Sequence, residues 1–330
     1  MTATVTALFG GTGPDWTPAR FPYPSQVPVG SWCARTRWHS TTPTPPCLLL
    51  PTPPRGGSSK EYRAGYEFPG EITVVGDGVG VDTATVGQRV MGTTPASFAQ
   101  YVLADHRHVL PVPDGLDFTE ACALPTRLLT EHGALTTGGY QPGQSLLITG
   151  ATSSIGLIGV RIARALGAGP IVATTRRAGK HDLLKQAGAD TIVVTSEQDL
   201  TQAVLDATAG EGGALALDHV GGQTFAAWLP ATKVDGAVVD IGRLGTAAAT
   251  IDLYALSYRH LRVHGVFFGF TRPTELGAVI AAAIQDLLPS VADGRVRPLT
   301  DSILSFNTAD QAVTRLRSHQ ALGKIVLTAP

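Results

Sequence analysis

Cysteine and charged side chains are scarce in this chain of 330 residues. The three cysteines, Cys33, Cys47 and Cys122, are too few and too scattered for a disulfide framework or a closed zinc site, so we expect reduced thiols. Charged residues make up 15% of the sequence, and 25 Lys and Arg nearly balance 26 Asp and Glu. Because this balance indicates no basic surface, we expect a small-molecule partner or a second copy of the chain rather than nucleic acid.

Long apolar runs are also absent from the sequence. No segment approaches the roughly 18 apolar residues of a membrane-spanning helix. The N-terminal stretch MTATVTALFGG has neither the basic region nor the long apolar region of a secretory signal. We therefore expect a cytoplasmic protein with no membrane contact. The length allows two domains, each with its own buried core.

The region before residue 140 changes character once. Residues 71–113 contain short β-rich runs separated by Gly, Asp and Pro, which predicts a small and mostly antiparallel β unit. Residues 117–137 then follow a helical pattern, with Thr119 as the candidate N-cap. Pro125 is expected to bend this helix or divide it in two, because proline lacks the backbone donor that a helix interior uses.

From residue 145 onward, strand and helix patterns alternate. A βαβ series of this length predicts an α/β fold class with a doubly wound, parallel sheet and right-handed crossovers. Two further helical patterns and a final strand, GKIVLTA, close the chain. The predicted strands of the alternating region are 145–150, 170–175, 190–194, 213–220, 236–242 and 261–270.

A glycine-rich turn stands between the first strand and the first helix of this region, in LLITGATSSIGLIGVRIARALGA. Gly150 permits the tight turn, and the small residues Ala151, Ser153 and Ser154 let the backbone approach a pyrophosphate group. The helix N-terminus adds N–H groups and a partial positive charge. Strand, turn and helix in this order predict a dinucleotide-binding site.

The residues after the second strand indicate which dinucleotide is bound. An NAD site is expected to carry Asp or Glu there to accept hydrogen bonds from the ribose hydroxyls. This chain has TTRRAGK instead, in which Thr175, Arg176, Arg177 and Lys180 offer donors to a 2′-phosphate. NADPH is therefore the predicted cofactor. The alternative is an ordinary solvated basic turn.

Several motifs extend this pattern through the chain, among them GYEFPGEITVVGDGV, VGQRVMG, GATSSIGLIGVRIARALGA, LDHVGG, GAVVDIGRLG and GKIVL. With them, the sequence from about Gly65 to its end resembles the medium-chain dehydrogenase/reductase superfamily, in particular its zinc-free quinone oxidoreductase and enoyl reductase branch. The resemblance implies a GroES-like, β-rich catalytic domain made of residues 1–118 and 273–330, with a Rossmann dinucleotide-binding domain at 119–272. It also implies a homodimer, commonly formed by edge-to-edge pairing of the last strands of the cofactor domains.

The resemblance further implies which residues contact the cofactor. It assigns one threonine to the nicotinamide side, the glycine-rich turn to the pyrophosphate and the basic turn to the adenosine phosphate. The implied set is Thr130, Gly150, Ala151, Ser153, Ser154, Ile155, Gly156, Thr175, Arg176, Lys180, Val220, Gly221, Gly242, Leu244, Phe267, Phe268 and Gly269.

Zinc-dependent members of the superfamily differ from this chain at two places. They carry a His-Glu pair where this chain has Tyr66 and Glu67, and a four-cysteine lobe that this sequence lacks. We therefore expect no metal. Without a Lewis acid, hydride delivery to an electron-poor double bond is easier than alcohol oxidation. The expected function is an NADPH-dependent oxidoreductase that reduces a quinone or an activated C=C bond in an enone or enoyl thioester.

The proton donor and the substrate side are less defined by the sequence. Tyr66 is the candidate acid, and a tyrosine hydrogen-bonded in the core is the alternative. Arg127 and His132 replace residues that are more often apolar or aromatic in the family, so they either shape the pocket or lie on a solvated helix face. The alternative function is a catalytically weak protein that binds the cofactor and has a structural or sensing role.

Residues 31–60 depart from the family pattern. The segment SWCARTRWHSTTPTPPCLLLPTPP shows no recognisable strand of the family type V-R-V-x-A, and its prolines cannot pair in a central strand. Two explanations remain open, a frameshift in the gene and a divergent segment, and the nucleotide sequence would distinguish them. The missing strand gives weight to the alternative function.

Overall fold

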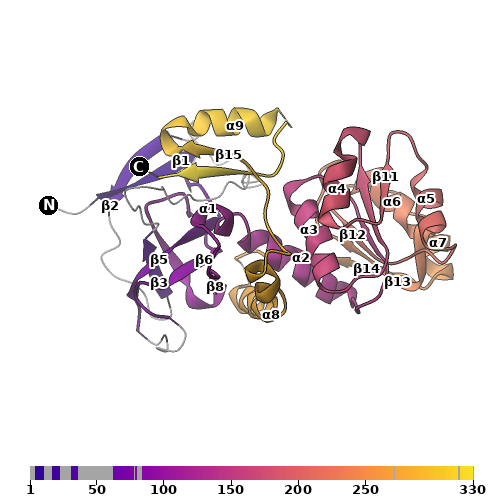
Figure 1. The fold of residues 1–330 in the computed structure, drawn as a ribbon, viewed down its shortest axis with the longest axis horizontal. Coiled ribbons are helices and arrows are strands. Elements are labelled where there is room, and N and C mark those ends of the chain that lie inside the picture. The colour runs from indigo at the N-terminus through magenta and orange to yellow at the C-terminus, as the bar shows by residue number, and fades with distance from the viewer. Residues whose placement is uncertain are drawn as a thin grey trace. The chain divides into compact units, whose positions relative to one another are not determined.

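The structure is a computed structural model that describes residues 4–10, 17–22, 31–35, 62–77, 79, 84–270, 272–318 and 320–329. The chain folds into two compact units, and neither unit is continuous in sequence (Figure 1). The sequence prediction placed the domain boundaries after residues 118 and 272. The first unit contains residues 1–126, 269–284 and 298–330, and the second contains 127–268 and 285–297.

The first unit contains a five-stranded sheet. All of its neighbouring strands are antiparallel, in the order β7-β3-β5-β6-β8. Phe68, Ile72, Val90 and Val102 belong to its buried core. The antiparallel β unit expected over residues 71–113 is therefore confirmed. The strands are β3 (Ser31–Arg35), β5 (Glu67–Val75), β6 (Arg89–Thr93), β7 (Tyr101–Asp105) and β8 (Val109–Pro111), with a 3-10 turn η1 (His106–His108) before β8.

Strand β3 lies at the start of the atypical segment. Its backbone pairs with β5 on one side and with β7 on the other, so it is an internal strand of the sheet. The sequence showed no strand of the family type in this segment, whereas its first five residues form a strand in the structure. Residues 36–61, which include the proline-rich run, lie outside the described residues.

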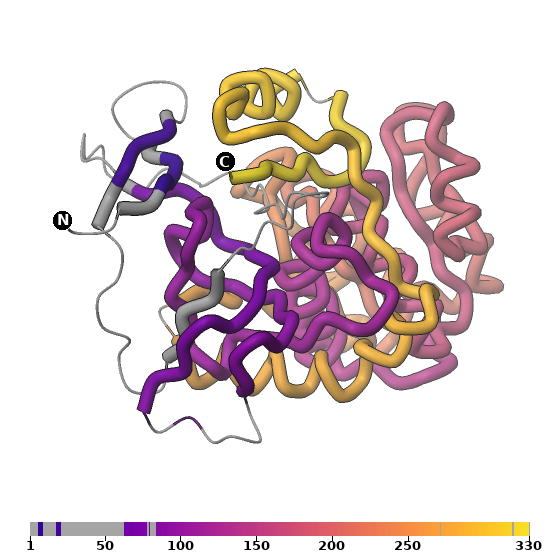
Figure 2. The backbone as a smooth tube through the Cα atoms, turned by 60° about the vertical axis from the view of Figure 1, so that its left-hand side comes forward, coloured from indigo at the N-terminus to yellow at the C-terminus, as the bar shows by residue number. Residues whose placement is uncertain are grey.

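Both ends of the chain contribute to one core in the first unit. Leu8 and Phe98 pack in the same buried cluster as Phe306, Ile325 and Leu327. Figure 2 shows the C-terminal strands and helix, in yellow, beside the indigo and purple N-terminal part. This is the arrangement that the GroES-like resemblance implied. The elements are β1 (Thr4–Gly10), β2 (Thr17–Pro22), β4 (Tyr62–Arg63), β15 (Thr300–Ser305), η4 (Phe306–Thr308), α9 (Ala309–Arg317) and β16 (Lys324–Thr328).

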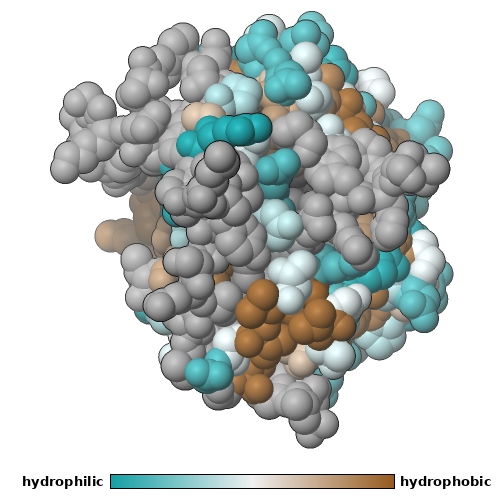
Figure 3. Space-filling model, turned by 90° about the vertical axis from the view of Figure 1, so that its left-hand side faces the viewer, coloured by the Kyte–Doolittle hydropathy of each residue, from teal (hydrophilic) through white to brown (hydrophobic). Residues whose placement is uncertain are grey.

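Strand β7 shows how the first unit divides its side chains between core and surface. Leu103 is exposed between the buried residues Val102 and Ala104, as the two-residue period of a half-buried strand requires. Val74 and Val86 are also exposed in this unit. The face drawn in Figure 3 carries hydrophobic surface next to hydrophilic side chains. Part of the surface of the first unit is therefore apolar.

Cys122 differs from the expectation that all three cysteines are reduced. Cys122 is fully buried and disulfide-bonded, and its partner lies outside the described side chains. The expectation of reduced thiols was therefore wrong for this residue. A disulfide requires two sulfur atoms to meet in the fold, which their spacing in the sequence does not determine.

The second unit contains a six-stranded parallel sheet. Its order, β11-β10-β9-β12-β13-β14, is that of a doubly wound Rossmann fold. Every residue of the central strands β9 and β10 is buried, because helices cover both faces of such a sheet. The predicted fold class is confirmed. The strands are β9 (Leu146–Ile148), β10 (Ile171–Thr175), β11 (Thr191–Val194), β12 (Gly213–Asp218), β13 (Thr232–Asp240) and β14 (Arg262–Gly265).

Helices cover the two faces of this sheet in separate groups. In Figure 1, α3 and α4 lie on one side and α5, α6 and α7 on the other. Asp199 and Asp252 cap α5 and α7 through their side chains, and Trp228 is the largest fully buried side chain among the described residues. The elements are α3 (Ser154–Ala165), η2 (Ala178–Lys180), α4 (His181–Ala187), α5 (Leu200–Ala207), α6 (Gly222–Trp228), η3 (Leu229–Ala231) and α7 (Leu253–Tyr258).

Two helices precede the parallel sheet in the chain, α1 (Phe118–Ala121) and α2 (Pro125–Gly138). Pro125 is the first residue of α2, so the predicted division of the helical pattern is confirmed. The N-cap of α1 is Asp117, whose carboxylate accepts a hydrogen bond from the Glu120 N–H at 2.8 Å. The assignment of this cap to Thr119 was wrong.

Helix α8 (Pro273–Ala292) is the longest in the described residues. By length and composition it could cross a membrane, with a mean hydropathy of 1.4, so the expectation that no segment reaches this level was wrong. The core helix of a globular protein passes the same test, and α8 contains Pro289 and Asp286. One such helix is weak evidence for a membrane span.

Candidate functional site

The glycine-rich turn joins β9 to α3. Gly150 has a φ of 56°, in the left-handed region that favours glycine. Its N–H donates to Thr174 Oγ1 at 3.1 Å, and the Ala151 N–H donates to Thr174 O at 3.1 Å. Ser153 caps α3, because its Oγ accepts a hydrogen bond from the Gly156 N–H at 3.1 Å. The turn is thus held by β10 on one side and by the helix cap on the other.

Gly156 allows a close approach between the turn and the first helical residues. A Cβ at this position would lie 2.7 Å from Gly150 O and 2.8 Å from Ala151 Cα. Any other residue would therefore push the helix away from the turn. The N–H groups of the first helical turn have no partner within the helix and can bind an anion. The geometry fits the pyrophosphate of a dinucleotide.

A basic loop follows β10. Arg176 and Arg177 are exposed and Lys180 is half-buried. No ion pair involves these three side chains in the described part of the chain. The predicted ligand Thr175 is buried, and its hydroxyl bonds to the backbone of Arg177 at 3.1 and 3.3 Å. Ser196 Oγ donates to Arg176 O at 2.9 Å, so the loop backbone is held in place while both arginine residues are exposed.

The loops after β12 and β13 meet the glycine-rich turn. A Cβ at Gly150 would lie 3.2 Å from Val220 Cγ2 and 3.7 Å from Leu244 Cδ1. A Cβ at Gly242 would lie 2.9 Å from a carbonyl oxygen of the loop after β12, which also contains Gly221. These predicted residues come together at the carboxyl ends of the strands, where ligands bind in open α/β sheets.

The other residues predicted to contact the cofactor or the substrate lie outside these loops. Thr130 is half-buried on α2, and Phe267 and Phe268 follow β14 in the second unit. Gly269 belongs to the first unit, as does Tyr66. The second unit therefore carries all of the predicted cofactor residues except Gly269.

Tyr66, the candidate proton donor, is half-buried in the first unit. Its ring stacks on Phe270, with ring centroids 5.8 Å apart and an angle of 17° between the planes. Its hydroxyl has no hydrogen-bond partner among the described residues, so the alternative of a core tyrosine held by a hydrogen bond is not what the structure contains.

Within the described part of the chain, no group of three His, Cys, Asp or Glu side chains could hold a metal ion.

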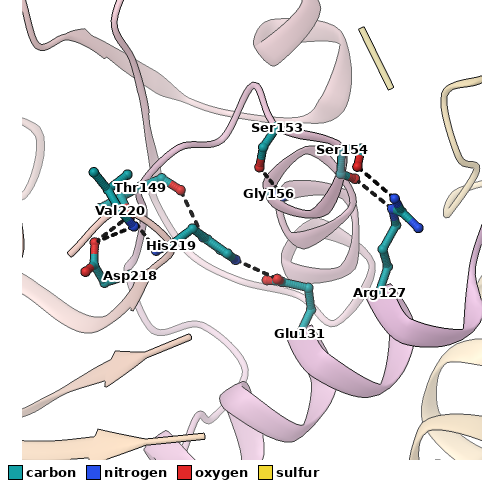
Figure 4. A network of polar contacts seen from close by, with 9 residues as sticks. All are labelled: Arg127, Glu131, Thr149, Ser153, Ser154, Gly156, Asp218, His219 and Val220. Atoms are coloured by element: carbon teal, nitrogen blue, oxygen red, sulfur yellow. Dashed lines mark hydrogen bonds and ion pairs between the residues drawn. The ribbon is translucent and has the colours of Figure 1, made fainter. Parts of the chain in front are cut away.

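Sequence reasoning missed a buried polar network beside the turn (Figure 4). His219 Nε2 lies 2.7 Å from Glu131 Oε1, and both side chains are almost completely buried. Burial opposes a charge on the imidazole, but the negative charge and hydrogen bond of Glu131 outweigh it and raise the pKa of His219. The sequence does contain a signal for this network. The apolar patterns LLTEHGAL and ALALDHV each enclose a charged residue, and a buried charge requires a partner.

Arg127 and His132, on the same helix as Glu131, are also buried. The Arg127 guanidinium donates to Ser154 O at 3.1 Å and to Ser154 Oγ at 2.7 Å. His132 Nε2 lies 2.7 Å from Asp286 Oδ2 on α8. The alternative of a solvated helix face was therefore wrong for both residues. His132 pairs with Asp286 of α8 and, among the described residues, bonds to no residue of the glycine-rich turn.

Comparisons with known proteins agree with this architecture. The family model described as "Zinc-binding dehydrogenase" matches residues 154–284. The bovine (Bos taurus) quinone oxidoreductase-like protein 2 is 26% identical over 81% of this chain and 76% of the relative. The erythronolide synthase EryA2 of Saccharopolyspora erythraea is 29% identical over 81% of this chain, which spans only 7% of that synthase.

A solved structure of a mycobacterial protein complexed with NADPH superposes with a TM-score of 0.81. The match covers 98% of this chain and 99% of the other, at 21% identity, and so concerns the fold. The curated relatives and the matched family model point to the same group of oxidoreductases. The matched family model, the curated relatives and the solved structures together support the medium-chain dehydrogenase/reductase superfamily.

Proposed function

We propose that this protein is an NADPH-dependent oxidoreductase that transfers hydride to a quinone or to an activated C=C bond, without zinc. The observation that carries the proposal is the basic loop after β10. Its cationic groups have no carboxylate partner among the described residues, and Thr174, at the end of the same strand, bonds to the glycine-rich turn. When bound, the nicotinamide would supply the hydride. The residues of this site bind and orient the phosphates.

The choice of NADPH over NADH is tested at Arg176. A charge-assisted hydrogen bond to the 2′-phosphate contributes about 1.5–3 kcal/mol, so Arg176→Ala is expected to weaken NADPH binding about 10- to 100-fold. NADH lacks this phosphate, and its dissociation constant serves as the internal control. Titration by nicotinamide fluorescence measures both constants. Equal losses for the two cofactors, or tighter NADH binding by the unmodified protein, would contradict the NADPH assignment.

The proposed acceptors follow from the relatives and from the residue at the zinc position. The curated relatives carry the names of a quinone oxidoreductase-like protein and of a polyketide synthase, and Tyr66 stands where zinc-dependent members have histidine. The test is a panel of quinones, enones and a crotonyl thioester with NADPH, followed by nicotinamide absorbance with and without a chelator. We expect turnover that the chelator does not change. Cofactor binding without turnover would favour the catalytically weak alternative.

Tyr66 is the proposed proton donor. Its stacking on Phe270 holds the ring, which a proton donor requires for a defined orientation. Tyr66→Phe keeps the ring and removes only the hydroxyl, so kcat for an enone is expected to fall about 10²- to 10⁴-fold while NADPH affinity stays the same. An unchanged kcat would assign the proton to water. Quinone reduction provides a second acceptor on which to compare the loss.

A cytoplasmic homodimer completes the proposal. β14 is the edge strand of the parallel sheet, and Val263 on it is 45% exposed. Exposed Tyr254 and Tyr258, which stack on each other, add apolar surface to the same unit. Val263→Lys is expected to convert a dimer to a monomer in light scattering, because an inserted charge disfavours edge pairing. Cell fractionation tests the compartment.

A further inference from the structure

The pair formed by Glu131 and His219 connects α2 to the glycine-rich turn. His219 Nδ1 lies 2.9 Å from Thr149 O, and Thr149 directly precedes Gly150. A carbonyl oxygen only accepts, so Nδ1 must carry a hydrogen. The other ring nitrogen then shares one proton with the Glu131 carboxylate, 2.7 Å away. The pair satisfies its own hydrogen bonds and fixes the orientation of the imidazole.

The same imidazole belongs to a network that includes the loop after β12. The hydroxyl of Thr149 donates a hydrogen bond to Asp218 Oδ1 at 2.6 Å. The same hydroxyl oxygen of Thr149 accepts a hydrogen bond from the backbone N–H of His219 at 2.8 Å. Asp218 Oδ2 accepts from the Gly221 N–H at 2.8 Å. Thr149, which precedes the turn, and the loop after β12 are therefore held by one connected set of hydrogen bonds, of which Figure 4 draws the part from Glu131 to Asp218.

The burial of the Glu131 carboxylate is energetically unfavourable. Its Oε2 is buried and has no hydrogen-bond partner among the described residues. A Cβ on Gly159 of the neighbouring helix α3 would clash with that oxygen, so a larger residue there would displace the carboxylate. A buried carboxylate oxygen without a partner is unfavourable, so core packing gives no reason for a glutamate here. The presence of Glu131 is explained by its hydrogen bond to His219, which in turn bonds to the residue before the turn.

We propose that Glu131 and His219 are positioning residues that hold the glycine-rich turn in its cofactor-binding conformation. Cofactor affinity then depends on the pair, whereas hydride transfer from bound cofactor does not. Arg127, one helical turn before Glu131, holds Ser154 at the other end of the same turn. One face of α2 thus supports both ends of the turn. The inference rests on the proposed function in one respect, that the turn binds a nicotinamide cofactor.

The test compares two matched variants on the same helix. Glu131→Gln keeps the size of the side chain but removes the charge that orients His219. His132→Gln breaks the other buried histidine–carboxylate pair of α2, which has the same 2.7 Å distance but contacts α8. Each variant is measured for its NADPH dissociation constant, kcat, KM for NADPH, melting temperature, and amide hydrogen exchange over residues 149–156 without cofactor.

We expect Glu131→Gln to raise the dissociation constant and KM for NADPH at least 10-fold and to speed exchange in the turn, with kcat unchanged. His132→Gln should lower the melting temperature without changing either cofactor constant. Thr149→Val removes the hydroxyl that links Asp218 to the backbone N–H of His219, so it should have the same effect as Glu131→Gln. If Glu131→Gln does not fold, Thr149→Val is measured in its place. Unchanged affinity and exchange in the variants at 131 and 149, or equal affinity losses in all variants, would overturn the inference.

The exchange measurement separates this inference from the proposed function. If the unmodified protein binds neither NADPH nor NADH, the proposed function fails, and with it the role of the pair in cofactor affinity. Faster exchange at 149–156 in Glu131→Gln would then still establish that the pair holds the turn. If the unmodified protein binds NADPH and Glu131→Gln binds it equally well, only the inference about the pair fails.

Discussion

The buried ion pair between Glu67 and Lys324 allows a sharp test of how the two chain ends are held together. Lys324 Nζ lies 2.5 Å from Glu67 Oε2, and the two side chains are 2% and 0% exposed. Glu67 Oε1 also accepts a hydrogen bond from the Thr126 N–H at 2.8 Å. Lys324→Met removes the cation, retains most of the side-chain volume, and leaves a carboxylate buried beside an apolar group.

The expected loss is large because the Glu67 carboxylate stays buried without the cation that neutralises it. Removing one partner of a buried ion pair costs about 3–5 kcal/mol, whereas replacing both charges is often close to neutral. Glu67→Gln with Lys324→Met removes both charges and keeps an oxygen for Thr126. The double variant should therefore regain most of the stability that Lys324→Met loses.

Amide hydrogen exchange in β5 and β16 measures this loss within the first unit. A loss of about 3 kcal/mol corresponds to exchange about 100-fold faster in these strands. β12 serves as the internal reference, because it belongs to the second unit. The reasoning would be refuted if Lys324→Met changed exchange less than 5-fold (about 1 kcal/mol). It would also be refuted if the double variant were no more stable than Lys324→Met, since packing rather than charge would then explain the loss.

Three further outcomes follow from the second unit. Gly156→Ala should abolish NADPH binding in a fluorescence titration, because its Cβ would meet the turn at 2.7 Å, whereas Gly179→Ala, with open space at the Cβ position, should bind normally. Trp228→Phe should cost less than about 1.5 kcal/mol in urea unfolding, since the buried indole N–H has no acceptor among the described residues, and Trp228→Ala about 3–5 kcal/mol. Because the pKa of His219 is raised in the folded protein, its contribution to stability is complete below about pH 6.5 and is lost as the pH rises through the raised value. The free energy of unfolding should therefore fall over that alkaline range in the unmodified protein and fall less in Glu131→Gln; parallel curves would contradict the assignment.

The second unit was the more predictable part of the fold, for a local reason. Each central strand, such as β9 and β10, is buried along its whole length, so it appears in the sequence as a continuous apolar run. Gly150 and Ser153 satisfy the local needs of a turn and a helix cap, which depend on neighbouring residues. β3 was missed because its pairing with β5 and β7 involves partners about 40 and 70 residues further along the chain, and no local pattern records it.

The sequence by itself determined the parallel sheet, the glycine-rich turn, the basic loop after β10 and the resemblance to the superfamily. These features follow from apolar periodicity, turn chemistry and charge over short stretches of chain. Only the tertiary structure decided which buried charges meet. Glu131 and His219 are 88 residues apart, and Glu67 and Lys324 are 257 residues apart. A buried charge requires a partner, but which residue supplies it depends on how distant helices and strands pack together.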